Sequence, residues 1–239
     1  MMRRAGKLLR GGNVWDFLPS RRPLNERDED VETKMTEHLV TTMADLEAMY
    51  ARPMETSLLK ELDHIGPHYR ALIESSPFVA LATVGPEGLD CSPRGDAAGF
   101  VRIQDEKTLL IPDRRGNNRI DSLRNIVRDP RVALLFLIPG VSETMRINGR
   151  AALSTDPELL ESFKVDGKAP RCVIVVTVER AYFQCAKAIV RSKLWDPTRH
   201  VPRGKLASTG AMVAALTRGK VDAETYDRDA PARIKAQLY

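Results

Sequence analysis

The sequence of 239 residues is 43% hydrophobic but only 5% aromatic, and it carries a formal net charge of +5. This composition excludes a globally disordered chain and predicts a core of Val, Ile, Leu and Ala. No apolar run approaches the ~18 residues of a membrane-spanning helix, so no integral membrane protein is expected. The cysteines Cys91, Cys172 and Cys185 lack C-x-x-C spacing, so we expect neither disulfides nor a zinc cage, and a cytoplasmic location.

The basic charge is concentrated in three segments. Residues 1–22 and residues 187–205 each carry six basic side chains against a single acidic one, and Arg114, Arg115 and Arg119 share one short segment. A DNA-binding surface more often follows a helix or alternates with aromatic side chains on a sheet. Tight arginine clusters also suit a small phosphorylated ligand. The remaining alternative is a basic, solvated surface.

Two helices are predicted before the first strand. Residues 1–35 are expected to form a flexible basic arm that lacks the apolar core of a secretion signal. The alternative is that the start codon has been placed too far upstream and that translation begins at a later methionine. Apolar residues recur at three- and four-residue spacing from Thr36 to about Tyr50, which predicts a helix. A second helix is predicted from Leu58 to Ile73, with an interruption at Gly66-Pro67.

Short apolar runs rich in β-branched residues predict strands from Phe78 onward. The run Phe78–Val84 ends in a hairpin-like connection, Gly85–Gly88, that leads to the next extended segment. Helices are predicted at about 119–128 and from Asp156-Pro157 through Phe163. Few helices between short strands favour an antiparallel barrel over a βαβ sheet. Further strands are predicted at 98–103, 107–112, 131–138, 145–153, 171–179 and 181–187.

The chain becomes basic and polar after Pro197, with a modest helical pattern around Met212–Leu216. We therefore expect residues 198–239 to form a C-terminal extension that lies on the surface or contacts a partner. The expected organisation is an arm of residues 1–35, a domain of residues 36–197 and this extension.

The segment most informative about function runs from Ile111 to Arg119, between a predicted strand and a predicted helix. Asn118 is expected to cap the helix, with Asp121 in a capping-box-like position. The free N–H groups of the helix start and the neighbouring arginines predict an anion site, and Gly116 is expected to adopt a backbone conformation closed to other residues. No P-loop or dinucleotide motif occurs. The alternative is a polar loop with solvated arginines.

Five motifs occur in a characteristic order over about residues 55–197. Together they resemble the pyridoxamine 5′-phosphate oxidase-like split-barrel flavoproteins, and their flavin-nucleotide-binding branch more closely than the vitamin-B6 enzyme itself. The motif by which that enzyme grips its substrate is not found near the C-terminus. The five motifs are Cys91-Ser-Pro-Arg-Gly-Asp96, Ile111-Pro-Asp-Arg-Arg-Gly-Asn-Asn-Arg119, Phe136-Leu-Ile-Pro-Gly140, Thr144-Met-Arg-Ile-Asn-Gly-Arg-Ala151 and Cys185-Ala-Lys-Ala-Ile-Val-Arg-Ser-Lys-Leu-Trp195.

The resemblance implies a mainly β fold, a six-stranded antiparallel split barrel with peripheral helices that dimerises and holds FMN at the subunit interface. In such proteins one loop binds the flavin phosphate and two strands contact the flavin ring. A segment near the C-terminus covers the flavin. By position, the phosphate contacts are Arg114, Asn117, Asn118 and Arg119; the strand contacts are Ser92, Arg94, Thr144 and Arg146; and the closing residues are Lys187, Arg191, Ser192 and Trp195.

The residue types agree with flavin chemistry. Reduced flavin carries negative charge near its N1–C2 carbonyl, so a neighbouring Arg or Lys favours the reduced form. Hydride transfer through flavin N5 needs no protein nucleophile. We therefore expect an FMN-dependent oxidoreductase acting on a small substrate, with NAD(P)H as a candidate donor.

Three alternatives stay open. The first is a non-catalytic flavin binder, and the second is a protein that binds the deazaflavin F420 or haem; haem would need one of four histidines outside the barrel segment (His38, His64, His68 and His200). The third is a nucleic-acid-associated protein that uses its basic arms. No metal site is expected, because Gly66-Pro67 disrupts the helix that would align His64 with His68.

Overall fold

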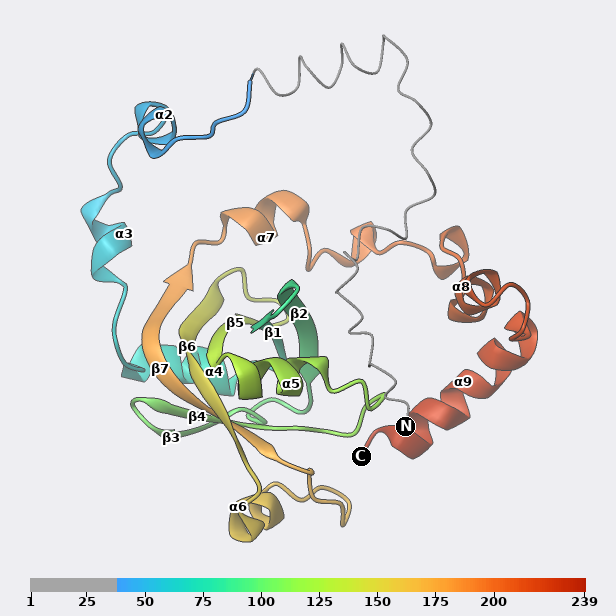
Figure 1. The fold of residues 1–239 in the computed structure, drawn as a ribbon. Coiled ribbons are helices and arrows are strands. Elements are labelled where there is room, and N and C mark those ends of the chain that lie inside the picture. Colours follow the sequence, from blue (N-terminus) through green and yellow to red (C-terminus); the bar gives the residue numbers. More distant parts are fainter. Residues whose placement is uncertain (1–37) are drawn as a thin grey trace, which may run out of the picture. The chain divides into compact units, whose positions relative to one another are not determined.

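The computed structural model describes residues 38–239, which divide into a first unit that ends at Pro53 and a second unit, Met54–Tyr239 (Figure 1). In the first unit, α2 (Met43–Ala48) is shorter than the helix predicted from Thr36 to Tyr50, and no residue of α2 is buried. A short helix is stable mainly when one face packs against the rest of the protein. The described part of the predicted helix has no such face, and only the six residues of α2, capped by Thr42, are helical there. The expected arm of residues 1–35 lies outside the described residues, and the boundary expected at residue 197 stays a prediction.

The second unit is built on one antiparallel sheet in the order β2-β1-β5-β6-β7-β4-β3. The sheet is not closed, and it has seven strands where six were expected. An open antiparallel sheet with helices confirms the mainly β fold class and is compatible with a split barrel. The strands are β1 (Phe78–Gly85), β2 (Gly88–Gly95), β3 (Arg102–Asp105), β4 (Thr108–Pro112), β5 (Arg131–Leu137), β6 (Thr144–Ser154) and β7 (Val173–Gln184).

The strand β7 is continuous where two strands, 171–179 and 181–187, were predicted. It pairs with β6 along its whole length, and the register shifts between Asn148 and Gly149 rather than breaking. A Cβ at Gly149 would overlap the carbonyl oxygen of Thr177, so only glycine allows the two backbones to approach this closely. The bulge therefore lies in β7, where Glu179 has no partner in β6, and β6 runs past it.

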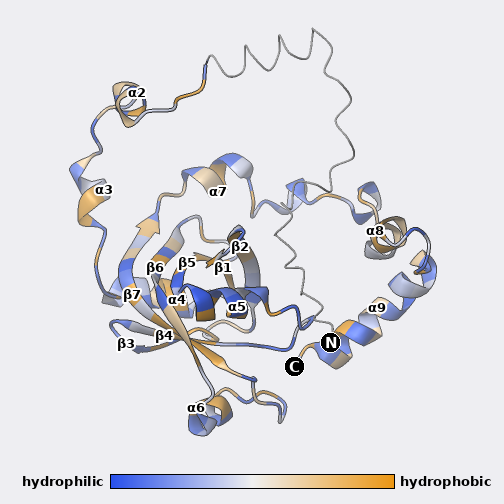
Figure 2. Ribbon diagram, viewed as in Figure 1, coloured by the Kyte–Doolittle hydropathy of each residue, from blue (hydrophilic) through white to orange (hydrophobic). Residues whose placement is uncertain are grey.

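Alternating side chains of the sheet form the core. In β1, Val79, Leu81 and Thr83 are buried, and in β5 every second residue from Val132 to Phe136 is buried. The first half of β7 is apolar, whereas β3 and α5 carry mostly hydrophilic residues (Figure 2). The largest fully buried side chains are Phe136, Phe163, Ile73, Leu81, Leu109, Ile111, Leu134, Met145, Ile147 and Ile174.

Two helices pack on the sheet: α4 (Pro67–Glu74) contacts β3, β6 and β7, and α5 (Asp121–Arg128) contacts β1, β2 and β6. The helix predicted from Leu58 to Ile73 is two helices, α3 (Glu55–Leu59) and α4, because Pro67 starts a new helix at its first turn. The predicted start of α6 (Pro157–Ser162) is confirmed, with the Asp156 carboxylate accepting hydrogen bonds from two N–H groups of the first turn.

The chain after β7 is helical. The helix α8 (Thr209–Leu216) confirms the pattern seen around Met212, whereas α7 (Lys187–Ser192) and α9 (Ala223–Gln237) were not predicted. The helix α8 contacts α9, and the Asp227 carboxylate accepts a hydrogen bond from Gly210 N–H at 2.7 Å. Two 3₁₀ turns, η2 (Pro197–Arg199) and η3 (Arg203–Lys205), connect α7 to α8.

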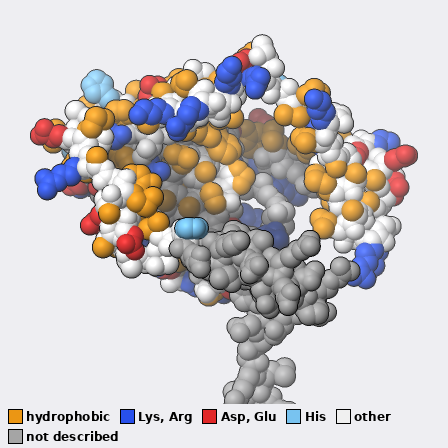
Figure 3. Space-filling model, turned by 90° about the horizontal axis from the view of Figure 1, so that it is seen from above, with side chains coloured by type: hydrophobic (Ala, Val, Ile, Leu, Met, Phe, Trp, Pro, Cys, Tyr) orange, Lys and Arg blue, Asp and Glu red, His pale blue; other side chains and the backbone are white. Residues whose placement is uncertain are grey.

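Apolar side chains remain exposed on the described surface, where Figure 3 shows them among lysine and arginine side chains. Val190 and Leu194 near α7 are examples. Among residues 38–239, no helix has both the length and the apolar character that crossing a membrane requires.

Candidate functional site

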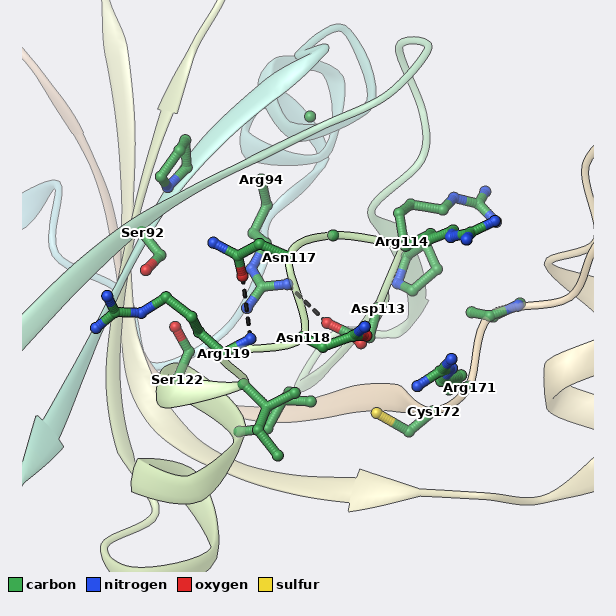
Figure 4. Close-up of a pocket in the computed structure, with 18 of the residues that line it drawn as sticks. Ser92, Arg94, Asp113, Arg114, Asn117, Asn118, Arg119, Ser122, Arg171 and Cys172 are labelled. Carbon is green, nitrogen blue, oxygen red and sulfur yellow. Dashed lines mark hydrogen bonds and ion pairs between the residues drawn. The ribbon is translucent and has the colours of Figure 1, made fainter. Parts of the chain in front are cut away.

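A cavity of about 1030 Å³ is lined by β2, the loop after β4, the first turn of α5 and the segment before β7. We call it the loop pocket, and its volume is at the upper end of the usual range for ligand sites. Figure 4 shows Ser92 and Ser122 on one side, Arg171 and Cys172 on the other, and Asn117 and Asn118 between them. Its lining comes from Asp90, residues 92–95, Phe100, residues 112–123, residues 168–172 and Tyr239.

The loop between β4 and α5 is held in an unusual backbone conformation. Asn118 and Ile120 have φ of 60° and 54°, in the left-handed region, whereas Gly116 does not adopt a positive φ. The expectation for Gly116 was therefore wrong. Asparagine tolerates this conformation, but a β-branched residue such as Ile120 is strained by it. Arg119 N–H donates to Asn117 Oδ1 at 3.1 Å, which stabilises the turn between them.

The first turn of α5 lines the loop pocket through Asp121, Ser122 and Leu123. Ile120 occupies the N-cap position and no side chain caps the helix, so the prediction that Asn118 is the cap was wrong. The physical reason is the positive φ of Ile120, which delays the helix by two residues and turns Asp121 toward Arg119. Uncapped N–H groups at a helix start carry partial positive charge and can bind an anion.

Three arginines of the loop pocket are held by carboxylates. Arg94 Nη1 lies 2.7 Å from Asp113 Oδ1, Arg114 Nε lies 2.6 Å from an Asp96 oxygen, and Arg119 Nε lies 2.8 Å from Asp121 Oδ2. The first two pairs are largely buried, whereas the Arg119 side chain is 75% exposed. Exposed pairs contribute little to stability, so Arg119 is the arginine that can most readily exchange its partner for a ligand.

The side with Ser92 is called the serine end, consisting of Asp90, Ser92, Arg119 and Ser122. The Asp90 carboxylate accepts hydrogen bonds from Ser92 Oγ at 3.2 Å and from Ser122 Oγ at 3.3 Å. These bonds fix both serine side chains beside the first turn of α5. The serine end therefore offers N–H and guanidinium donors within one part of the pocket, whereas the protons of both serine hydroxyls are already donated to Asp90.

The opposite side holds Arg114 and Arg171 (Figure 4), and the Tyr239 ring lies beside Arg114. We call it the arginine end and include in it the lining residues Arg115 and Lys168, which are close in the chain to Arg114 and Arg171. The Tyr239 hydroxyl donates to Asp96 Oδ1 at 2.7 Å, and the Arg114 guanidinium lies 5.5 Å from the centre of the Tyr239 ring. Burial acts to raise the pKa of Asp96, but hydrogen bonds from Tyr239, from Ala97 N–H and from Arg114 together lower it. Asp96 is therefore ionised at neutral pH and holds Arg114 at the wall.

Cys172 also lines the loop pocket, and it is buried. Burial raises its pKa to about 11, with a further contribution from the Asp113 carboxylate that Arg94 partly offsets. The thiol is therefore protonated at neutral pH and is not a nucleophile. Cys172 has a structural role through its carbonyl group, which accepts a hydrogen bond from Asp113 N–H at 3.0 Å.

A family model described as pyridoxamine 5′-phosphate oxidase matches residues 65–185, just over half of the chain. The chain belongs to the pyridoxamine 5′-phosphate oxidase family. The matched residues contain all seven strands of the sheet and, apart from Tyr239, the whole lining of the loop pocket. The resemblance carried by the five motifs is thus confirmed at the level of the family. No curated protein matches the sequence.

Three solved structures illustrate what the chain is similar to. HupZ of Group A Streptococcus is 21% identical over 50% of this chain and 93% of its own, with a TM-score of 0.41. General stress protein 26 of Bacillus anthracis is 15% identical, with coverage of 47% and 88% and a TM-score of 0.36. An F420 reductase is 20% identical, with coverage of 50% and 98% and a TM-score of 0.36.

Half of the flavin contacts that the family resemblance assigned come together in the loop pocket. These residues are Ser92, Arg94, Arg114, Asn117, Asn118 and Arg119. They converge because β2 pairs with β1 at one edge of the sheet while α5, which follows the loop, packs on both strands.

The other half of that set lies outside the pocket of the same chain. Thr144 is buried in β6, and Arg146 donates to the Tyr182 hydroxyl at 3.0 Å. Trp195 Nε1 donates to the Val141 carbonyl at 2.8 Å, so its indole is fixed after α7. The residues outside are Thr144, Arg146, Lys187, Arg191, Ser192 and Trp195.

Several pocket residues were not predicted from the sequence. Lys168 follows Asp166-Gly167, a pair typical of a tight hairpin, and this signal could have placed it at a turn. For Tyr239, no signal in the sequence indicates a contact with Asp96, because the two residues are far apart in the chain. Among the described residues, no cluster of three or more His, Cys, Asp or Glu side chains is placed to hold a metal ion.

Proposed function

We propose that this family member binds FMN in the loop pocket and is an oxidoreductase that passes hydride through flavin N5. The observation that supports the proposal most strongly is the uncapped first turn of α5 at the pocket, preceded by Asn117, Asn118 and Arg119. Free N–H groups and the positive end of a helix dipole suit a phosphate. Arg119 can add a charge-assisted hydrogen bond, because only exposed Asp121 holds it.

The residues near β2 suit the flavin ring. Arg94 is fixed by Asp113, and its Nε atom is buried without a hydrogen-bond partner among the described residues. A buried donor without a partner is costly, so a ligand acceptor at this position would be favourable. A guanidinium beside the ring also stabilises the negative charge of the reduced form. Bound flavin would supply the hydride chemistry, while Ser92 and Arg94 would orient it.

We further propose a homodimer in which the residues outside the pocket reach the flavin of the partner subunit. Lys187 and Arg191 are exposed on α7, and they make no ion pair among the described residues. The nearby side chains of Val190 and Leu194 are 60% and 46% exposed. Exposed apolar side chains beside free cations suit an interface that also contacts an anionic ligand.

Haem is the weaker candidate ligand for this pocket. The residues that line it in the described part of the chain include no histidine or methionine. Cys172 is the one lining residue able to ligate iron axially through sulfur, and its pKa of about 11 disfavours the thiolate.

Titration of the purified protein with FMN, followed by flavin fluorescence, tests the binding site. The Arg119→Ala variant should weaken FMN binding by about 1–3 kcal/mol, roughly tenfold to a hundredfold in Kd, because a charge-assisted hydrogen bond is lost. Arg124→Ala is the matched control, since Arg124 is exposed on the same helix but does not line the pocket. Equal affinities in the two variants would remove the phosphate assignment.

Absorbance between 300 and 700 nm then tests the activity. Flavin bands that bleach when NADPH is added support the oxidoreductase. Bands that persist with NADPH and with other donors support the alternative, a flavin binder without catalysis. A protein that ignores FMN contradicts the proposed function.

A further inference from the structure

We infer that the arginine end of the loop pocket binds the phosphate groups of a second ligand, a nucleotide that reacts with the flavin. The inference rests on the proposed function, which assigns the flavin phosphate to the first turn of α5. It adds a separate anion subsite on the opposite wall of the same cavity.

The first observation is an excess of unpaired positive charge. Six basic and three acidic side chains line the pocket. Three of the arginines are already held by carboxylates, whereas Arg115, Lys168 and Arg171 have neither an ion pair nor a side-chain hydrogen bond among the described residues. Like charges on one concave surface repel one another, and a polyanion relieves this repulsion. These three side chains are therefore the cations available to a ligand.

The second observation is that the segment carrying two of these cations has a well-defined backbone. Val165 and Lys168 exchange two backbone hydrogen bonds around Asp166 and Gly167, both of which have a positive φ. This is the two-residue hairpin that Asp-Gly favours. Buried Pro170 and the bond from Asp113 N–H to the Cys172 carbonyl then fix the chain on either side of Arg171. The cations are thus presented at a defined place on the pocket wall.

The third observation is the separation of this wall from the first turn of α5. Figure 4 shows Arg171 and Arg114 on the side opposite Ser92, Ser122 and Arg119, with the Asn117–Asn118 turn between them. Two groups of anion-binding donors on opposite walls favour two anionic groups in the cavity rather than one.

The chemistry of the arginine end points to a phosphorylated aromatic ligand. The arginine fork matches phosphate oxygens in a bidentate manner, and lysine adds a point charge. Tyr239 contributes an aromatic ring to the same wall, beside Arg114. An aromatic ring next to several cations is suited to a nucleotide, whose base can stack while its phosphates bind the cations.

The test is calorimetric titration of the FMN-loaded protein with inorganic pyrophosphate. We expect one site per chain and at least a tenfold weaker Kd in the Lys168→Ala/Arg171→Ala double variant, whose FMN affinity should stay within about twofold of that of the unmodified protein. The Arg124→Ala/Arg128→Ala double variant is the control, because it removes the same charge from exposed positions on α5 outside the pocket. Thermal unfolding of each variant verifies that it is folded.

Two other results of these titrations would contradict a second anion subsite at the arginine end. Absence of pyrophosphate binding to the FMN-loaded protein, or equal weakening in the two double variants, overturns the inference. Pyrophosphate that displaces FMN, together with weaker FMN binding in the Lys168→Ala/Arg171→Ala variant, shows that these cations hold the flavin phosphate and also overturns it. Failure of the proposed function is distinct, since it appears in the FMN titration of the unmodified protein before pyrophosphate is added.

Discussion

At the scale of single residues, the three cysteines should differ sharply in reactivity. Cys91 and Cys185 are exposed, whereas Cys172 is buried and its pKa is raised to about 11 by burial and by the Asp113 carboxylate. Alkylating reagents attack the thiolate, which Cys172 does not form until the pH approaches that value. At pH 8 we expect two thiols to react with iodoacetamide and the third to react at least about a hundredfold more slowly.

Mass spectrometry of the alkylated protein checks this expectation. In urea all three thiols should react at similar rates, because unfolding removes the burial that raises the pKa of Cys172. The Cys172→Ser variant should lose only the slow site. Three equal rates in the folded protein would contradict the described environment of Cys172.

The residues of the proposed anion site are only partly predictable from the sequence. The arginine and asparagine content of residues 111–119 is sufficient to predict an anion site near a helix start. The position of the helix start is not predictable in this way, since it depends on the positive φ of Ile120, a conformation that β-branched residues rarely adopt. The partners of the arginines are equally hidden, because Asp96 and Asp113 approach them only after the sheet has formed.

At the scale of the elements, the close approach of β6 to the bulge in β7 should depend on Gly149. A Cβ there would overlap the Thr177 backbone of β7, and backbone atoms cannot move aside as a flexible side chain can. We expect Gly149→Ala to lower the free energy of unfolding by about 1–3 kcal/mol or more. Gly204→Ala is the matched control, because no atom lies within 4 Å of its added Cβ.

Urea denaturation of the two variants measures the difference in unfolding free energy. The Gly204→Ala variant should stay within about 0.5 kcal/mol of the unmodified protein, as is usual for surface substitutions. Equal stability of the two variants would contradict the close approach of β6 and β7.

The elements themselves differ in how well the sequence predicts them. Strands such as β1 and β5 are recognisable in the sequence because they are short apolar runs that contain β-branched residues. The continuity of β7 is not recognisable in the sequence, because the polar residues around Arg180 in the middle of the strand are also typical of a turn. Only the pairing with β6 shows that the strand continues through them. The helices α7 and α9 have no clear apolar face in the sequence, and neither has more than one buried residue.

At the scale of the whole molecule, the proposed dimer should join α7 of one subunit to the pocket of the other. The Arg191→Ala variant should then bind FMN about tenfold less tightly, although Arg191 does not line the pocket of its own chain. Sedimentation of the unmodified protein should give twice the mass of one chain. A monomer that binds FMN as tightly with or without Arg191 would contradict the shared site.

The overall architecture was predictable in class but not in detail. Periodicity indicates which segments are strands, but it does not specify the order in which they pair. The seventh strand and the open edges at β2 and β3 follow from pairings between distant segments, such as β4 with β7. The contribution of Tyr239 to the pocket has the same origin, a contact across most of the chain.

The lining of the loop pocket has a consequence for how this protein can evolve. The central strands β1, β5 and β6 contribute no residue to that lining, which comes mainly from the edge strand β2, the loop after β4, the first turn of α5 and the segment before β7. Substitutions that alter ligand preference can therefore accumulate without disturbing the core that determines folding. Substitutions in the pocket lining can thus change ligand specificity while the folded core stays stable. Libraries that vary residues 114–119 and 168–171 should therefore retain a high proportion of folded members.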